Sequence, residues 1–224
     1  MTTTDNLALG LAAALREQTR LAHQAAETSP FVEDLLAGRL PLSAYASLVA
    51  QNYAIYQALE SLSAQWRDDP VAGAFIFDEL ARVPHLEHDL AELLGPSWPV
   101  IAAGLQTPAT RRYVAHLHEV CGDWAGGFIA HHYVRYLGDL SGGQAIRVAI
   151  ERIYGRPGAG AVSFYVFDGI ERIKPFRDLY RNLLDAAPLG VSERHRVVAE
   201  AIVAFDLNRA VFTDLATRAG EANG

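Results

Sequence analysis

The segment Tyr136–Gln144, YLGDLSGGQ, carries three glycines, Gly138, Gly142 and Gly143, inside an otherwise amphipathic helical stretch. A glycine in a helix interior costs roughly 0.8–1 kcal/mol relative to alanine, so three cost about 2–3 kcal/mol unless bare backbone is needed there. Gly138 and Gly142 are four residues apart and share one helical face, beside Asp139. The segment therefore predicts a flat, partly kinked surface that a large planar ligand can approach. Close packing of a second helix, or a simple kink, is the alternative.

Helical periodicity dominates the chain on both sides of this segment, with apolar residues recurring at steps of three and four. A glycine-rich connector is expected at 155–160, and only 162–167 resembles a strand. No linker divides the chain, so we predict one all-α domain over 1–224, a multi-helix bundle with disordered ends at about 1–6 and 219–224. The predicted helices cover 7–27, 31–37, 43–62, 71–82, 85–94, 107–120, 124–137, 144–154, 174–186 and 192–218.

Composition narrows the class of protein. The 224 residues are half apolar, and no window approaches the roughly 18 uninterrupted apolar residues of a membrane span. The N-terminus has no cationic region before its apolar run, which favours a cytoplasmic protein over a secreted one. A formal charge of −7 argues against nucleic acid as a partner. Cys121 is the only cysteine, which excludes an internal disulfide, a thiolate zinc cluster and covalent haem attachment.

Eight histidines raise the question of a metal site. The adjacent His131 and His132 point in different directions on a helix and do not easily share one ion. The chain contains no Glu-x-x-His pair, which removes the signature of a di-iron carboxylate bundle. Five others stand among charged residues and are predicted to be surface residues: His85, His88, His116, His118 and His195.

His23 differs from these because of the residues that share its helical face. Arg16, Thr19, Arg20 and Glu27 are spaced three and four residues apart around it. The two arginines lie one and two turns before the imidazole, within reach of carboxylates on a ligand whose iron is bound by His23. Glu27 lies one turn on, where it can hold the second ring nitrogen. An ordinary charged outer face with intrahelical ion pairs is the alternative.

Two segments resemble the haem oxygenase family, particularly its soluble bacterial members. TRLAHQAAE at 19–27 is similar to the proximal-ligand helix of that family, and YVRYLGDLSGGQ at 133–144 is similar to its distal helix. Three further segments look like family segments in the same order, at 52–60, 176–181 and 205–212. The resemblance extends over most of the chain.

The resemblance implies that haem b, bound as both cofactor and substrate, lies between a proximal helix and a glycine-kinked distal helix. His23 is then the axial iron ligand, and Asp139 anchors a water network over the iron. Lysine is common in the family at some propionate positions where this chain has Arg16, Arg20 and Arg177, so the seating of the propionates can differ. By the same resemblance the catalytic residues are Asp139, Gly138, Gly142, Arg135 and Tyr56. The remaining haem contacts are Arg16, Arg20, Glu27, Tyr133, Gly138, Gly142, Gly143, Arg177, Arg181 and Phe205.

The implied reaction uses dioxygen and external electrons to open haem to biliverdin, carbon monoxide and ferrous iron. No flavin or nicotinamide motif is present, so a ferredoxin or flavoprotein reductase is the implied electron donor. No stable membrane anchor is expected, because the chain ends in TRAGEANG. The alternatives are a haem carrier or sensor without turnover, a thiaminase-like helical enzyme with Cys121 as nucleophile, and a helical scaffold without chemistry.

Overall fold

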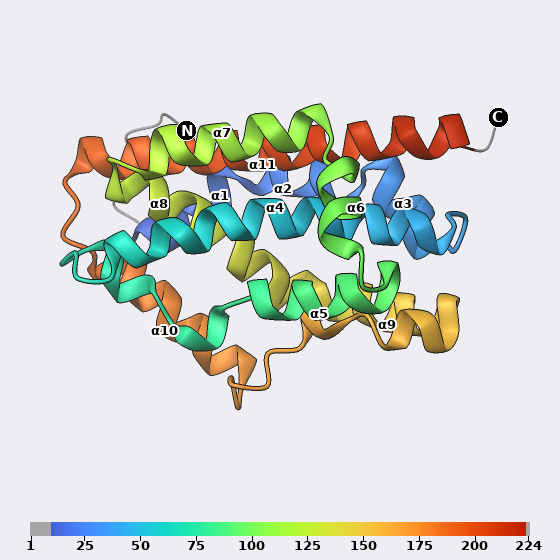
Figure 1. Ribbon diagram of the computed structural model, residues 1–224. Helices are drawn as coiled ribbons and strands as arrows, with labels where there is room; N and C mark the ends of the chain where they lie inside the picture. Colours follow the sequence, from blue (N-terminus) through green and yellow to red (C-terminus); the bar gives the residue numbers. More distant parts are fainter. Residues whose placement is uncertain (1–9, 223–224) are drawn as a thin grey trace.

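The central element of the fold is a long helix that is buried on most sides. A computed structural model describes residues 10–222, apart from the side chains of 156–159 and 222. The central helix, α4 (Leu42–Trp66), is buried along most of its length, as expected of a helix that has neighbours on every side. α7 (Pro108–Cys121) and α11 (Val191–Ala222) both pack against it and against each other (Figure 1).

The glycine-rich segment belongs to a rod that crosses the molecule. It consists of α8 (Ala125–His132), a π-helical turn η4 (Tyr133–Leu137) and α9 (Gly138–Ala159), and it runs toward the lower right of Figure 1. The sequence predicted that helix would resume only at Gln144. Instead the helix continues through all three glycines, and the distortion is the π turn just before the first of them. The connector predicted at 155–160 is wrong for most of its length: the chain kinks at Gly155, where φ is 59°, and helix continues beyond the kink to Ala159.

Three short helices at the N-terminal side cover α11. They are α1 (Leu11–Gln18), α2 (Arg20–Glu27) and α3 (Pro30–Leu36). The sequence predicted one helix over 7–27, of which 7–9 lie outside the described residues. The rest is divided at Thr19, whose hydroxyl donates to the backbone carbonyl one turn earlier at 2.8 Å. Such a bond from a side chain to its own helix bends the helix, and here it separates α1 from α2.

The helix predicted over 71–82 is wrong. Two 3₁₀ turns take its place, η2 (Ala72–Phe75) and η3 (Asp78–Leu80). Carboxylates accept hydrogen bonds from backbone N–H groups on both sides of these turns. Asp69 accepts two such bonds at the start of the segment, and Glu60 accepts two at its end. Because these carboxylates satisfy the N–H groups, the segment does not need a regular helix.

The faint strand signal at 162–167 is also wrong. The segment contains a 3₁₀ turn, η5 (Ser163–Tyr165), and the described residues offer it no partner strand. Asp89 on α5 (Val83–Leu94) accepts the first two N–H groups of the turn at 2.9 Å each. The buried guanidinium of Arg82 donates to two carbonyls of the same segment. An apolar segment whose backbone is hydrogen-bonded to buried side chains therefore gives the same sequence signal as a strand.

The remaining elements follow the sequence more closely. α10 (Ile173–Ala186) matches its predicted range, whereas α6 (Trp98–Leu105) was not predicted. α11 continues to Ala222, so 219–222 are helical rather than part of a disordered end. The other residues expected to be disordered, 1–6 and 223–224, lie outside the described range. The predicted all-α fold class is confirmed.

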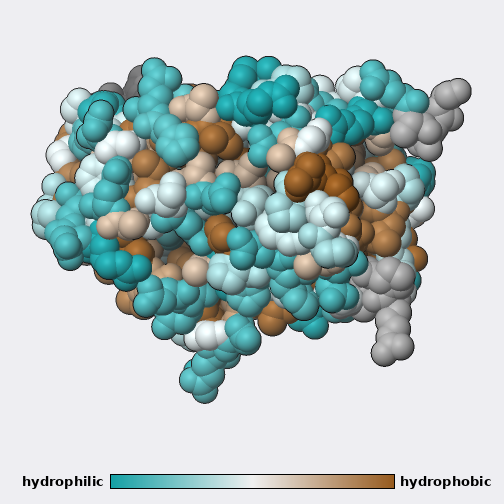
Figure 2. Space-filling model, viewed as in Figure 1, coloured by the Kyte–Doolittle hydropathy of each residue, from teal (hydrophilic) through white to brown (hydrophobic). Residues whose placement is uncertain are grey.

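The surface is mixed in character. The face in Figure 2 is largely hydrophilic, with one compact hydrophobic patch in the region of α6, where Val100 is 79% exposed. Among the described helices, none combines the length and the apolar composition that crossing a bilayer requires.

Candidate functional site

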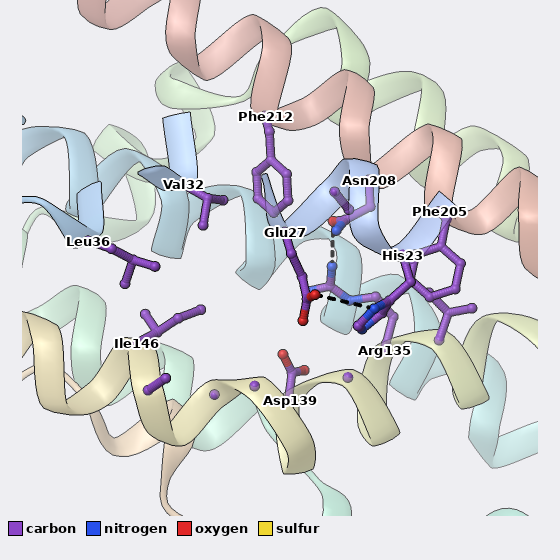
Figure 3. Close-up of a pocket in the computed structure, with 16 residues that line it drawn as sticks. His23, Glu27, Val32, Leu36, Arg135, Asp139, Ile146, Phe205, Asn208 and Phe212 are labelled. Atoms are coloured by element: carbon purple, nitrogen blue, oxygen red, sulfur yellow. Dashed lines mark hydrogen bonds and ion pairs between the residues drawn. The ribbon is translucent and has the colours of Figure 1, made fainter. Parts of the chain in front are cut away.

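A cavity of about 330 Å³ opens between the N-terminal helices and α11 on one side and α9 on the other (Figure 3). A second cavity of about 240 Å³ continues from it, because His23 and Gly138 line both. Together they form a slot with apolar walls and a polar outer end. The apolar lining of the first cavity includes Val32, Leu36, Val134, Ile146, Phe205 and Phe212.

His23 forms one wall of the slot. It lies on α2, and the edge of its ring meets Phe205 of α11 with the centroids 5.5 Å apart. Its Nδ1 is 3.4 Å from a carboxylate oxygen of Glu27, one turn further along the helix. A carboxylate at Nδ1 fixes the orientation of the ring and leaves Nε2 for another partner. The imidazole is therefore oriented as a ligand, with its free nitrogen available to a metal.

Bare backbone forms the opposite wall. Methyl groups built at Gly138 and Gly142 meet no other atom within 4 Å, so both glycines border open space. Gly143 differs, because a methyl group there comes within 2.8 Å of the Tyr165 ring. Of the three glycines, two keep the slot open, while the third lets the helix approach Tyr165.

Asp139 rises from α9 into the slot, facing the side from which His23 comes (Figure 3). Tyr56 of α4 donates a hydrogen bond to its carboxylate. Burial raises the pKa of Asp139 above its ordinary value, while Arg135 and Tyr56 act in the opposite direction. Burial also raises the pKa of Tyr56 well above its ordinary value, so the phenol remains a proton donor.

Arg135 lies beside this pair and is held by amides that sequence reasoning did not assign to the site. Its two terminal nitrogens donate to Asn208 of α11 at 2.8 Å and to Asn52 of α4 at 2.9 Å. The guanidinium carbon is 4.9 Å from the centre of the Tyr56 ring. Both asparagines interrupt apolar stripes of buried helices, and a polar residue in such a stripe was the signal that could have indicated them.

Cationic and hydroxyl side chains surround the outer end of the slot. Arg16, Arg20, Tyr133 and Arg181 line the second cavity. Arg177 lines neither cavity, but it donates to the hydroxyl of Ser141, which lines the second one. These residues come from α1, α2, η4 and α10, and an anionic ligand edge at this end meets several positive charges.

The predicted surface location of His116 is wrong. Its side chain is only 25% exposed and contacts Glu200, which also contacts the buried His131. The charged neighbours in the sequence gave the wrong signal, because α7 turns His116 toward α11 and leaves His118 exposed. These three residues line neither cavity of the slot.

The slot fits a flat metal-bearing ring. It supplies one oriented imidazole, a facing wall without side chains, apolar sides and cations at one end. This combination in a helical protein suits a metal porphyrin.

Comparison with known proteins identifies the family. A family model described as "Heme oxygenase" matches residues 9–214. Rat heme oxygenase 1 is 36% identical over 94% of this chain and 73% of its own length, and heme oxygenase 2 of Synechocystis is 36% identical over 92% and 82%. The crystal structure of Synechocystis heme oxygenase-1 in complex with heme covers 96% of both chains at 33% identity, with a TM-score of 0.89. The chain belongs to the heme oxygenase family.

The contrast between two glycines gives a stability test. In the ligand-free chain, Gly142→Ala should raise the free energy of unfolding by up to about 1 kcal/mol, because alanine favours helix and the new methyl group meets no atom. Gly143→Ala should not raise it, since Tyr165 must move. Urea unfolding of both variants measures the difference. Equal stabilisation by the two substitutions contradicts the assignment of Gly142 to the open wall.

Proposed function

We propose that the slot binds haem b between His23 and the bare face of α9, and that the chain opens the ring to biliverdin, carbon monoxide and ferrous iron. The observation that carries this proposal is the pairing of His23 with Gly138 and Gly142 across an apolar cavity. Two Synechocystis relatives with TM-scores of 0.89 were solved in complex with heme, which supports haem as the ligand. Family membership supports the same activity.

His23 would hold the haem iron through Nε2, with Glu27 at Nδ1. Haem itself supplies the iron that activates dioxygen and the ring carbons that are attacked. The chain contributes orientation: Gly138 and Gly142 keep side chains away from the distal face, so the space above the iron is limited by main chain. The open space beside these glycines would leave room for a small molecule next to the ring, and positioning of reactants in such a space can lower a barrier by several kcal/mol.

Asp139 is the proposed polar group of the distal side. It accepts from Tyr56 and lies beside Arg135, so it can bind a water molecule in the slot and pass a proton through it. Arg135, held by its bonds to the two asparagines, places a positive charge near this carboxylate. Tyr56, Arg135 and Asp139 are therefore proposed to act as one unit, and Asp139 and Arg135 both line the slot.

The propionates are proposed to lie at the cationic end of the slot. Arg16, Arg20, Arg181 and the Tyr133 hydroxyl line this end, and Arg177 lies close by through Ser141. Arginine binds carboxylates with a planar pair of donors, which fixes the ring in its plane more firmly than a single ammonium group. The rotation of haem in the slot then follows from this set of side chains.

The electron donor is proposed to be an acidic ferredoxin or a flavoprotein reductase. The chain carries a net charge of −7, yet cations gather at the haem edge, and Lys174 lies exposed one turn before Arg177 on α10. A local positive patch on an acidic protein steers an acidic partner toward that edge.

The axial ligand is tested by His23→Ala. The variant should lose haem turnover, and added imidazole should restore part of it, because the small base can enter the space left by the side chain. His118→Ala, on the exposed side of α7, is the control and should retain full activity. The readout is the loss of the haem Soret band and the appearance of biliverdin after ascorbate or a reductase is added in air. A wild-type chain that keeps its Soret band in this assay is a haem carrier.

The distal carboxylate is tested by Asp139→Asn. The amide keeps the size of the side chain but cannot accept and return a proton, so biliverdin formation should fall roughly 100-fold or more. Asp206→Asn, an exposed change on α11, is the matched control. Single-turnover spectra with product analysis measure the effect. A normal yield of biliverdin from the Asp139→Asn variant would exclude the proposed role.

The donor face is tested by Lys174→Glu. The substitution should raise the KM for ferredoxin. Added salt should also raise the KM of the wild type, because screening weakens the attraction between the two proteins. Turnover with ascorbate should stay constant in both cases, since Lys174 lines neither cavity. Arg111→Glu on α7 is the charge-matched control. Equal effects of the two reversals on KM argue against docking at α10.

A further inference from the structure

Three side chains with metal-binding atoms meet at the junction of α7, α8 and α11. They are His116, His131 and Glu200, one from each helix. The Nε2 atoms of both histidines face the same carboxylate oxygen, Oε1 of Glu200, at 2.6 and 2.9 Å. The three ligand atoms lie within 4.8 Å of one another. The haem chemistry proposed above uses none of these residues.

The spacing of these atoms is close to that of a metal site. Nitrogen and oxygen ligands bind zinc at about 2.0–2.2 Å, so ligand atoms around one ion lie roughly 3–3.5 Å apart. The two distances from Glu200 are slightly shorter than this. A small outward movement of its carboxylate makes room for an ion between the three atoms. No backbone change is required, because a carboxylate at the end of a glutamate side chain moves by rotation.

The environment also prepares the ligands. His131 is completely buried, and its Nδ1 is 3.3 Å from the hydroxyl of Tyr113, a contact that fixes the ring with Nε2 toward Glu200. Burial lowers the pKa of His131, which favours the neutral form that binds metals. Burial also raises the pKa of Glu200, but hydrogen bonds from His131 and His116 outweigh it, and the pKa lies below its ordinary value.

Access comes from the side of His116. Its side chain is 25% exposed, compared with 13% for Glu200 and none for His131. An ion at this junction therefore keeps coordination positions that water can fill. Two imidazoles and one carboxylate with open positions form a ligand set typical of divalent first-row transition metals.

We infer that His116, His131 and Glu200 bind one divalent first-row transition-metal ion, such as Zn²⁺ or Fe²⁺, at the junction of α7, α8 and α11. The ion ties three helices together one helical turn before Arg135, which lies four residues after His131. This site is separate from the haem slot, and the inference does not depend on the proposed function.

Cobalt is the probe, because Co²⁺ takes the same ligands and its visible d–d bands report on them. The full-length, haem-free chain carries His23→Ala as background, since His23 and Glu27 form a second histidine–carboxylate pair. We expect one Co²⁺ per chain, with loss of the bands in His116→Ala and in Glu200→Gln. His118→Ala, two residues along the same helix and exposed, should bind Co²⁺ as the parent does. Tyr113→Phe should weaken binding about 10- to 100-fold.

Two results overturn the inference. One is the absence of stoichiometric Co²⁺ binding by the parent chain, which leaves the cluster as a hydrogen-bonded contact between helices only. The other is binding that persists in folded His116→Ala, which places the ion elsewhere. Circular dichroism checks the fold of each variant, and His116→Ala decides the matter if Glu200→Gln does not fold, because His116 is the most exposed of the three. Zn²⁺ should also raise the thermal midpoint of the parent but not of His116→Ala.

Discussion

The buried guanidinium of Arg135 is the interaction on which the geometry of the slot depends. It connects the rod through the centre of the molecule to α4 through Asn52 and to α11 through Asn208, and it lies against Tyr56. A buried cation requires hydrogen-bond partners. The two terminal nitrogens of Arg135 find theirs on different helices, while its Nε has none among the described residues, so these two bonds hold the helices at one separation. Since the slot lies between α9 and α11, that separation sets its width. The carboxylate of Asp139 then receives a fixed position beside a fixed charge.

The π-helical turn η4 lies where the rod passes from the protein core to the wall of the slot. A π turn adds a residue to the helical ladder, which rotates everything after it by about 100° relative to an ideal helix. Before the turn, α8 is buried on nearly all sides between α7 and α11. After it, Gly138 and Gly142 face open space. The turn thus coincides with the change from core helix to cavity wall, in keeping with the frequent occurrence of π turns at functional sites.

The sequence predicted the long helices well, because helical periodicity is a local signal. Periodicity located α4, α10 and most of α11, and the glycine spacing located the open wall. It failed where distant side chains replace regular backbone bonds. Asp69 and Glu60 stabilise 3₁₀ turns where a helix was predicted, and Asp89 accepts hydrogen bonds from the supposed strand.

The parts of the site that were not predicted depend on contacts across the bundle. Asn52 and Asn208 lie far apart in the chain, and only the packing of α4 against α11 brings them to one guanidinium. His116 was misplaced for a similar reason, since its charged neighbours in sequence do not reveal the carboxylate that faces it from α11.

A wall of main chain has a consequence for the protein in the absence of its ligand. Val32, Leu36 and Ile146 border the slot, and without a ring between them these apolar surfaces meet water instead of one another. The glycines Gly138 and Gly142 also deprive α9 of side chains that stiffen a helix. Local opening of the native state in this region therefore requires less free energy than in the packed core, and a ligand that fills the slot suppresses that opening by mass action. Substrate capture and the final ordering of this part of the chain are one thermodynamic event.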